Sequence, residues 1–138
     1  MKHQIYRNIA IFGIFFALAV VSVQAQAPSR VEVNIPFEFS AGKTTLKPGV
    51  YSIKRMSGNL LSLRNTEDES TVILNAPVNL SSTDTKAGER LVFAKDGDQY
   101  LLSQIWLTVD SGRELPVKTG TPKPERIEIS LRTTAVNR

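Results

Sequence analysis

The chain has 138 residues, a formal net charge of +4 at pH 7 and no cysteine. The absence of cysteine excludes a disulfide framework, a thiolate nucleophile, a cysteine-ligated metal and a lipid-modified cysteine. A chain of this length buries roughly two-thirds of its unfolded surface, which is enough for one independent domain without cross-links. We therefore expect a single domain that is stabilised by its hydrophobic core.

The N-terminal segment has the charge and hydropathy pattern of an export signal. Lys2 and Arg7 supply a positive start, and an apolar run of 13 residues, Ile9–Val21, follows. A helix that stays in a bilayer needs roughly 20 apolar residues. The run is therefore typical of a signal core rather than of a permanent span.

Small residues at Val23 and Ala25 favour cleavage before Gln26. We expect residues 1–25 to be removed as a signal peptide and residues 26–138 to form the exported domain. Its location would be the periplasm, the cell envelope or the extracellular space, with no transmembrane span after removal of the signal. An uncleaved membrane anchor is the alternative.

Removal of the signal would also take away Lys2, Arg7 and the single histidine, His3. Two of the 17 basic residues are then lost, and the remaining 15 against 13 acidic residues give a net charge of +2. These basic residues are scattered and form no cluster of about five to eight. We expect no nucleic-acid partner.

From residue 31 onward apolar and polar residues alternate, which indicates β-strands with one buried face. In Val31–Phe39 every second residue is apolar. Pro36 cannot donate to a strand ladder, so this strand lies at an edge or is broken there. The pattern predicts an all-β fold.

A hairpin is predicted after the Pro48–Gly49 turn. A three-residue loop at 57–59 pairs Ile53 with Leu63 and separates apolar from polar side chains, whereas a two-residue loop mixes them. The next strand then faces its neighbour through Val72 and Leu74. The predicted inner face consists of Tyr51, Ile53, Leu61, Leu63, Val72 and Leu74.

A second hairpin is predicted in Leu91–Trp106. Asp96–Gly97 is typical of a two-residue type I′ turn, because both central positions need positive φ. This turn pairs Lys95 with Asp98, Phe93 with Tyr100 and Leu91 with Leu102. The second face is also apolar, which suggests a central strand pair covered on both sides; it consists of Val92, Ala94, Leu101 and Ile105.

The last strand is predicted at about residues 126–132, with Ile127, Ile129 and Leu131 facing inward. About seven to eight strands result, which suits a small antiparallel β-sandwich or a partly closed barrel. The sequence leaves both architectures open. The outward Lys, Arg and Glu residues argue against an outer-membrane barrel.

Four phrases together resemble a family of small exported proteins of unknown function from acidobacterial genomes. They are "VNIPFEF", "LKPGVYSI", "ERLVFAKDGDQYLLSQIW" and "GRELP", and the resemblance runs from about Val31 to Pro116. It implies export and an all-β fold, and it says little of function, because no activity, ligand or catalytic residue is assigned in that family. After Pro116 the sequence departs from the family pattern, so the final strand rests on alternation alone.

Residues 26–138 contain neither histidine nor cysteine. A Ser-His-Asp triad, a Cys-His pair and a histidine-ligated metal are therefore excluded from the exported domain. A pair of carboxylates, as in glycoside hydrolysis, is what remains for an enzyme. No spacing brings two acids together, and we expect no catalytic residue and no cofactor; the acids considered are Glu89, Asp98, Asp110 and Glu114.

Three residues, Trp106, Arg113 and Glu114, are candidates for contact with a ligand or partner, and Tyr100 is considered together with Trp106. Arg113 and Glu114 follow a turn and present a charged pair, for which a local ion pair is the simpler interpretation. Trp106 and Tyr100 would suit an aromatic platform, although burial is the simpler interpretation for both. Acidic turns at 67–69 and 96–98 resemble parts of calcium loops, but they lack the further ligands of a calcium site.

These observations favour an exported, non-catalytic β-domain that binds a partner, such as an envelope protein or a glycan, or has a structural role. A barrel-type carrier of a small apolar ligand is the alternative. A carboxylate-based carbohydrate-active enzyme comes third. A filled interior would favour the first function, and an apolar cavity of a few hundred Å³ would favour the second.

Overall fold

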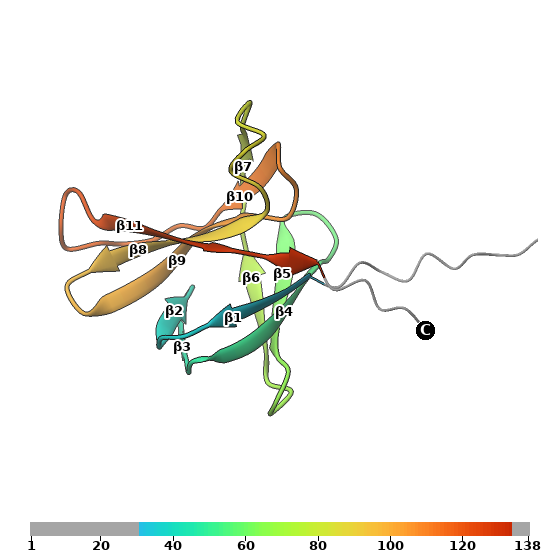
Figure 1. Ribbon diagram of the computed structural model, residues 1–138. Coiled ribbons are helices and arrows are strands. Elements are labelled where there is room, and N and C mark those ends of the chain that lie inside the picture. The colour runs from blue at the N-terminus through green and yellow to red at the C-terminus, as the bar shows by residue number, and fades with distance from the viewer. Residues whose placement is uncertain (1–30, 134–138) are drawn as a thin grey trace, which may run out of the picture.

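The computed structural model describes residues 31–133, and this part of the chain is built from β-strands without helices (Figure 1). The expected signal peptide, residues 1–25, lies outside the described residues. The all-β prediction is confirmed. The strands are β1 (Val31–Ile35), β2 (Phe39–Ala41), β3 (Thr44–Leu46), β4 (Gly49–Arg55), β5 (Leu60–Asn65), β6 (Thr71–Asn75), β7 (Val78–Ser81), β8 (Arg90–Asp96), β9 (Gln99–Trp106), β10 (Ser111–Glu114), β11 (Glu125–Ser130) and β12 (Arg132–Thr133).

The strands form two sheets that pack as a β-sandwich. The first sheet has the order β12-β1-β4-β5-β6, and the second has the order β11-β8-β9-β10-β7. The short β2–β3 hairpin joins the second sheet through a parallel bridge between Ser40 and Leu101. All other pairings are antiparallel.

Continuous chain connects the edges of the two sheets at both sides of the sandwich. β6 and β7 are edge strands of different sheets and are separated only by Ala76 and Pro77. β11 and β12 are related in the same way through Leu131. Such corners, where the chain switches sheets, are typical of barrel-like sandwiches.

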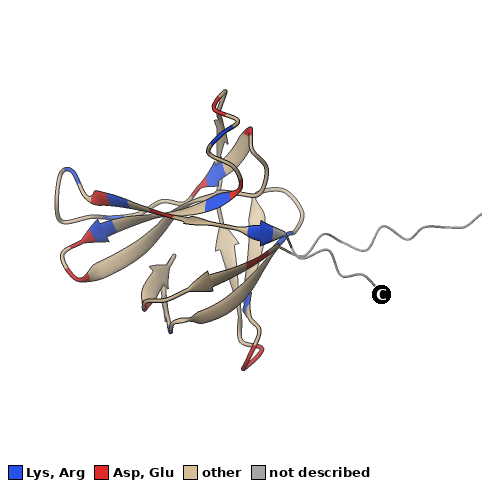
Figure 2. Ribbon diagram, in the orientation of Figure 1, with Lys and Arg blue, Asp and Glu red and all other residues tan. Residues whose placement is uncertain are grey.

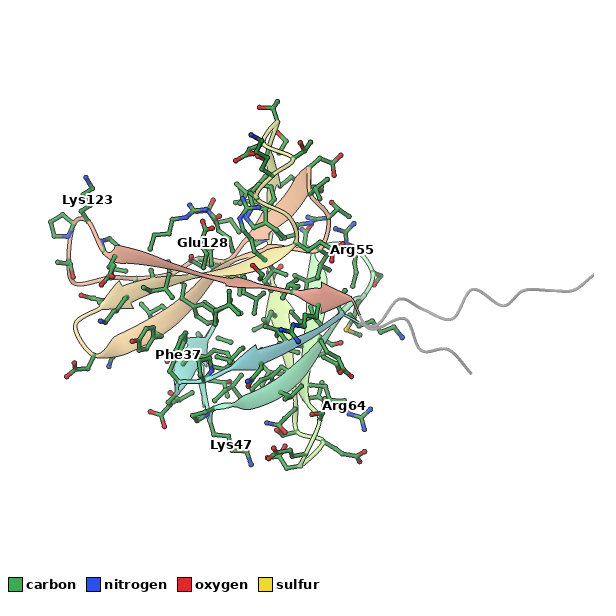
Figure 3. All side chains as sticks on the ribbon, in the orientation of Figure 1. Phe37, Lys47, Arg55, Arg64, Lys123 and Glu128 are labelled. Carbon is green, nitrogen blue, oxygen red and sulfur yellow. The ribbon has the colours of Figure 1, made fainter. Side chains whose placement is uncertain are left out.

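The core lies between the sheets, and both contribute side chains that are almost completely buried (Figure 3). Phe37 stacks on Tyr100 with 3.9 Å between ring centroids and meets Phe93 edge-on at 5.1 Å. Phe93 and Tyr100 therefore lie on the same face of their hairpin, as the alternation predicts. Lysine and arginine are spread over several strands and turns (Figure 2).

The predicted register of the first sheet is confirmed. Ile53 pairs with Leu63, and the N–H of Met56 donates to the carbonyl of Leu60, which closes the predicted three-residue loop at 57–59. Leu63 pairs with Val72 and Leu61 with Leu74, so the predicted inner residues lie together. β1 ends before Pro36, which confirms the predicted break.

The predicted turn of the second hairpin is wrong by one position. Asp96 pairs with Gln99, so the central turn residues are Gly97 and Asp98, and Lys95 pairs with Tyr100. Gly97 has φ +61°, and Asp98 is not among the residues with positive φ. A type II′ turn, which needs glycine at its first central position, explains this choice. Lys95–Asp98, Phe93–Tyr100 and Leu91–Leu102 are therefore not directly opposite pairs.

The predicted second face of this hairpin is also wrong at Ile105, because the hairpin contains a bulge. The register shifts between Val92 and Phe93, after which Leu91 pairs with Ile105 and Arg90 with Trp106. An extra residue in one strand turns the following side chains to the other face. Ile105 therefore lies in the core, 1% exposed, and Trp106 takes the opposite face.

The predicted last strand exists as β11, which pairs with β8 and directs Ile127 and Ile129 toward the core. The predicted number of strands is too low, because twelve short strands occur among residues 31–133. The predicted strand Val31–Phe39 is divided into β1 and the start of β2, the predicted strand 126–132 is divided into β11 and the start of β12, and β3, β7 and β10 were not predicted. Strands of two to four residues are too short to show a period of two.

Candidate functional site

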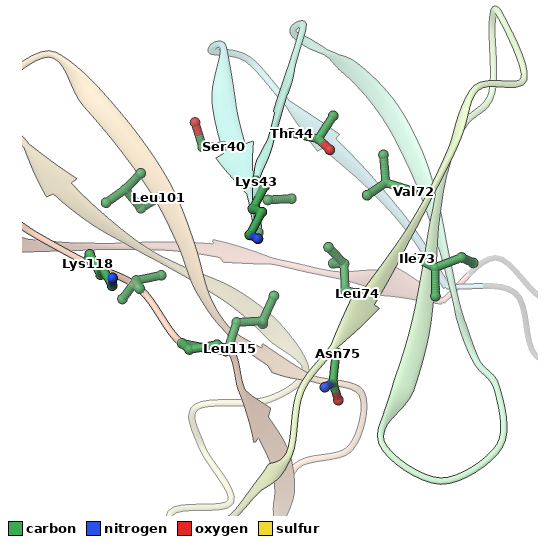
Figure 4. Close-up of a pocket in the computed structure, with 14 residues that line it drawn as sticks. Ser40, Lys43, Thr44, Val72, Ile73, Leu74, Asn75, Leu101, Leu115 and Lys118 are labelled. Atoms are coloured by element: carbon green, nitrogen blue, oxygen red, sulfur yellow. The ribbon is translucent and has the colours of Figure 1, made fainter.

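A groove with a volume of about 650 Å³ lies at the corner where the chain leaves the first sheet (Figure 4). Four segments line it: residues 40–44 of the β2–β3 hairpin, residues 72–75 of β6, Leu101 of β9, and residues 115–118 after β10. We call this feature the seam groove. It lies within the range of about 300–1,000 Å³ that is typical of ligand pockets.

The floor of the seam groove is apolar and belongs to the core. Ala41, Leu74 and Leu115 each expose at most 3% of their surface. Gly42 holds the turn of the β2–β3 hairpin with φ +62°, and a Cβ built on it would lie 3.9 Å from Leu74 Cδ2. The glycine turn therefore brings the hairpin against β6 and shapes one end of the groove.

One wall of the seam groove is the free edge of β6. Backbone hydrogen bonds from Asn65 to Ser70 and from Ala76 to Asn59 show which residues of β6 are hydrogen-bonded to β5. Because hydrogen-bonded pairs alternate in an antiparallel ladder, residues 70, 72, 74 and 76 bond to β5. Residues 71, 73 and 75 therefore direct their N–H and C=O groups away from β5.

The charged residues that line the seam groove are both positive. Lys43 and Lys118 stand at its border, and none of the described residues that line it is acidic (Figure 4). Two exposed apolar side chains flank it, Ile73 at 50% and Val117 at 38% exposure. The groove thus combines an apolar floor, an unpaired strand edge and two cations.

The predicted candidate Trp106 is buried on the outer face of the second sheet and offers no open platform. The guanidinium of Arg90 lies 4.4 Å from the indole centroid. Indole Nε1 donates to Gln104 Oε1 at 3.1 Å. Arg90 is itself buried and donates to the carbonyl of Gly88 at 2.9 Å. The cation–π contact between Arg90 and Trp106 therefore stabilises the fold.

The predicted candidates Arg113 and Glu114 lie on opposite faces of β10. Arg113 Nη1 donates to Asn59 Oδ1 at 2.9 Å, which ties the second sheet to the β4–β5 loop of the first. Glu114 pairs in register with Gln104. The structure does not bring Arg113, Glu114 and Trp106 into one pocket, and none of them lines the seam groove.

Two of the acids considered for catalysis, Asp98 and Asp110, are far apart. Asp98 lies at one end of β9 and Asp110 beyond the other end. Because a strand rises about 3.3 Å per residue, the eight residues of β9 separate these acids by roughly 25 Å. A glycosidase pair needs a separation of roughly 5–9.5 Å. No group of three or more potential metal-ligating side chains occurs in residues 31–133.

The two acidic turns are held by protein donors. Asp68 accepts hydrogen bonds from the N–H and hydroxyl of Ser70 and lies 2.9 Å from Lys47 Nζ. Asp96 accepts from the backbone of Gly120 at 2.6 Å and from the Thr121 hydroxyl. Hydrogen bonds from Lys47 to Asp68, and from Thr121 to Asp96, hold the pKa of each carboxyl below its usual range.

Sequence reasoning missed the seam groove and the buried side chain of Asn65. Asn65 Oδ1 accepts from the N–H groups of Glu67 and Asp68, at 2.8 and 3.3 Å, and shapes the turn between β5 and β6. An asparagine before an acidic turn is the available signal. The groove has no such signal, because its residues come from four distant segments.

Comparison with protein families, with curated proteins and with solved structures found no match. Among residues 31–133 no helix is long and apolar enough to cross a membrane.

Proposed function

We propose that this protein is an exported, non-catalytic β-domain that binds a partner through the seam groove. The observation that carries the proposal is the groove of about 650 Å³ beside a filled core. Its apolar floor and its unpaired backbone edge are features of binding sites. The proposed partner is a component of the envelope or of the extracellular space.

Export rests on the pattern of residues 1–25, and the resemblance to small exported acidobacterial proteins supports it. The non-catalytic role rests on the side chains present. Residues 26–138 have no histidine or cysteine, and the carboxylates of Asp68 and Asp96 are bound by neighbouring protein groups. What the seam groove offers is apolar contact, cations and backbone hydrogen bonds.

A carrier of a small apolar ligand is the second candidate, and the volume of the seam groove favours it. The filled core between the sheets argues against a ligand inside the sandwich. A fluorescent apolar anion such as anilinonaphthalene sulfonate separates this candidate from partner binding. Binding of the probe to the wild-type protein that is lost in Thr44→Trp supports a small-ligand site.

Photo-crosslinking tests the proposal in the cells that produce the protein. Benzoylphenylalanine at position 44 places the reactive group in the seam groove, and the same residue at exposed Thr85 is the matched control. We expect a discrete adduct from position 44 that position 85 does not give, identified by mass spectrometry. Equal labelling from both positions, or no adduct from position 44, contradicts the proposal.

A further inference from the structure

We propose that the seam groove receives an extended segment of another protein, which pairs with β6 as an added strand of the first sheet. The segment would carry carboxylate side chains that face Lys43 and Lys118. This inference rests on the proposed function and names the class of its partner. Strand addition of this kind derives affinity from main-chain hydrogen bonds and specificity from alternate side chains.

The first support is the unpaired backbone of β6. The N–H and C=O groups of residues 71, 73 and 75 point away from β5, toward the groove. This follows from the alternation of hydrogen-bonded pairs between β5 and β6. A strand at the usual spacing of about 4.8 Å would satisfy these groups. Figure 4 shows β6 along one side of the groove and the 115–118 segment across from it.

The second support is the composition of β6. Edge strands are usually protected by charges, by proline or by bulges. Thr71–Asn75 contains no charge and no proline, and its central residue, Ile73, is half exposed. By contrast β11, an edge strand of the other sheet, carries Glu125, Arg126 and Glu128. β6, which borders the groove, therefore lacks the charges and the proline that usually prevent an edge strand from pairing with another chain.

The third support is charge complementarity. Lys43 and Lys118 approach the groove from different segments, the β2–β3 turn and the chain after β10. No described lining residue offers them a carboxylate within the groove. An incoming segment with acidic residues would supply one, and its apolar residues would lie on Leu74 and Leu115.

The shape of the groove favours an extended segment over a second copy of this chain. A strand of about five residues is roughly 17 Å long and only one strand wide. The 115–118 segment lies across the groove from β6 (Figure 4), and the volume of the groove, about 650 Å³, is that of a ligand site and not of a folded domain. A second folded copy would have to bring its own first sheet into the same space.

Selection from a displayed library of random dodecapeptides, on purified protein, tests the inference. The matched variants are Ile73→Pro and Ile73→Thr. Proline removes an N–H that points away from β5 and so blocks the edge without breaking the β5–β6 ladder. Threonine removes the same apolar side chain and keeps the N–H.

We expect selected peptides to alternate apolar and acidic residues. Their affinity should fall at least tenfold on Ile73→Pro and less than threefold on Ile73→Thr. N-methylation of alternate peptide bonds should abolish binding to the wild-type protein, and this readout does not depend on the folding of any variant. Bound peptide should protect the amide hydrogens of Ile73 and Asn75 from exchange.

Failure of the inference is distinguishable from failure of the proposed function. If position 44 gives its adduct but no peptide is enriched, or if binding ignores Ile73→Pro and N-methylation, strand addition is wrong and the groove remains a binding site. Dimerisation of the free protein through β6, detected by sedimentation and lost in Ile73→Pro, also overturns the inference. Absence of both the adduct and peptide binding removes both proposals.

Discussion

Gly112 lies against the indole of Trp106, and a Cβ built on Gly112 would stand 2.5 Å from Cδ2 and 2.8 Å from Cε2 of that ring. The two residues are paired across β9 and β10. The guanidinium of Arg90 also packs on this ring, 4.4 Å from its centroid, and Trp106 is only 5% exposed, so the ring has little room to move. The glycine in "GREL" is therefore required by packing.

This contact predicts that Gly112→Ala destabilises the protein. Overpacking of a filled site costs about 1–3 kcal/mol, which urea unfolding at constant m-value measures. Trp106→Leu makes room for the added methyl group, so the double variant should lose less than the sum of the single variants. Strict additivity would show that the close approach does not limit packing.

The buried side chain of Asn65 predicts a second stability effect. Asn65→Ala removes the acceptor of two backbone N–H groups, so the free energy of unfolding should fall by about 1–3 kcal/mol. Asn79→Ala, on an exposed position of β7, should change it by less than about 0.5 kcal/mol. Equal effects of the two substitutions would contradict the role of Asn65 in the turn.

The turn of the second hairpin gives a third prediction. Gly97 has φ +61°, so Gly97→Ala should reduce the free energy of unfolding by about 1–2 kcal/mol. Asp98→Ala should be nearly neutral, because Asp98 is exposed and has no positive φ. A loss for Asp98→Ala as large as that for Gly97→Ala would contradict a turn in which only the glycine has positive φ.

Acid should weaken the β5–β6 turn. Because the hydrogen bond from Lys47 lowers the pKa of Asp68 in the folded protein, its contribution to stability is present above the unfolded pKa of about 3.9. That contribution is lost as pH falls from there toward the lower folded pKa. Unfolding curves of the wild type should therefore decline more steeply below about pH 4 than those of Asp68→Asn. Parallel declines would contradict the pairing with Lys47.

Much of the first sheet was predictable from the sequence, because polarity alone distinguishes the two possible registers of Ile53 against Leu63 or Arg64. The second hairpin was harder, because Asp96-Gly97-Asp98 contains two overlapping turn signals with glycine in different places. The bulge at Val92 has no signature in the alternation, so Ile105 was assigned to the wrong face. Local patterns thus predicted strands and not their irregularities.

The candidate site was less predictable than the fold. Trp106, Arg113 and Glu114 were selected by side-chain chemistry, and packing decides what each of them does. The seam groove depends on the approach of four distant segments and on the backbone phase of β6, which no single segment encodes. Lys43 and Lys118, 75 positions apart in the sequence, are related only after folding.

Affinity for the partner captured from position 44 tests most directly the claim that the seam groove is the binding surface. Thr44→Trp fills the groove from an exposed position, and Thr85→Trp adds the same side chain elsewhere. We predict at least a tenfold increase in the dissociation constant for Thr44→Trp and less than a twofold change for Thr85→Trp. Equal affinity of the two variants for the partner would contradict the account.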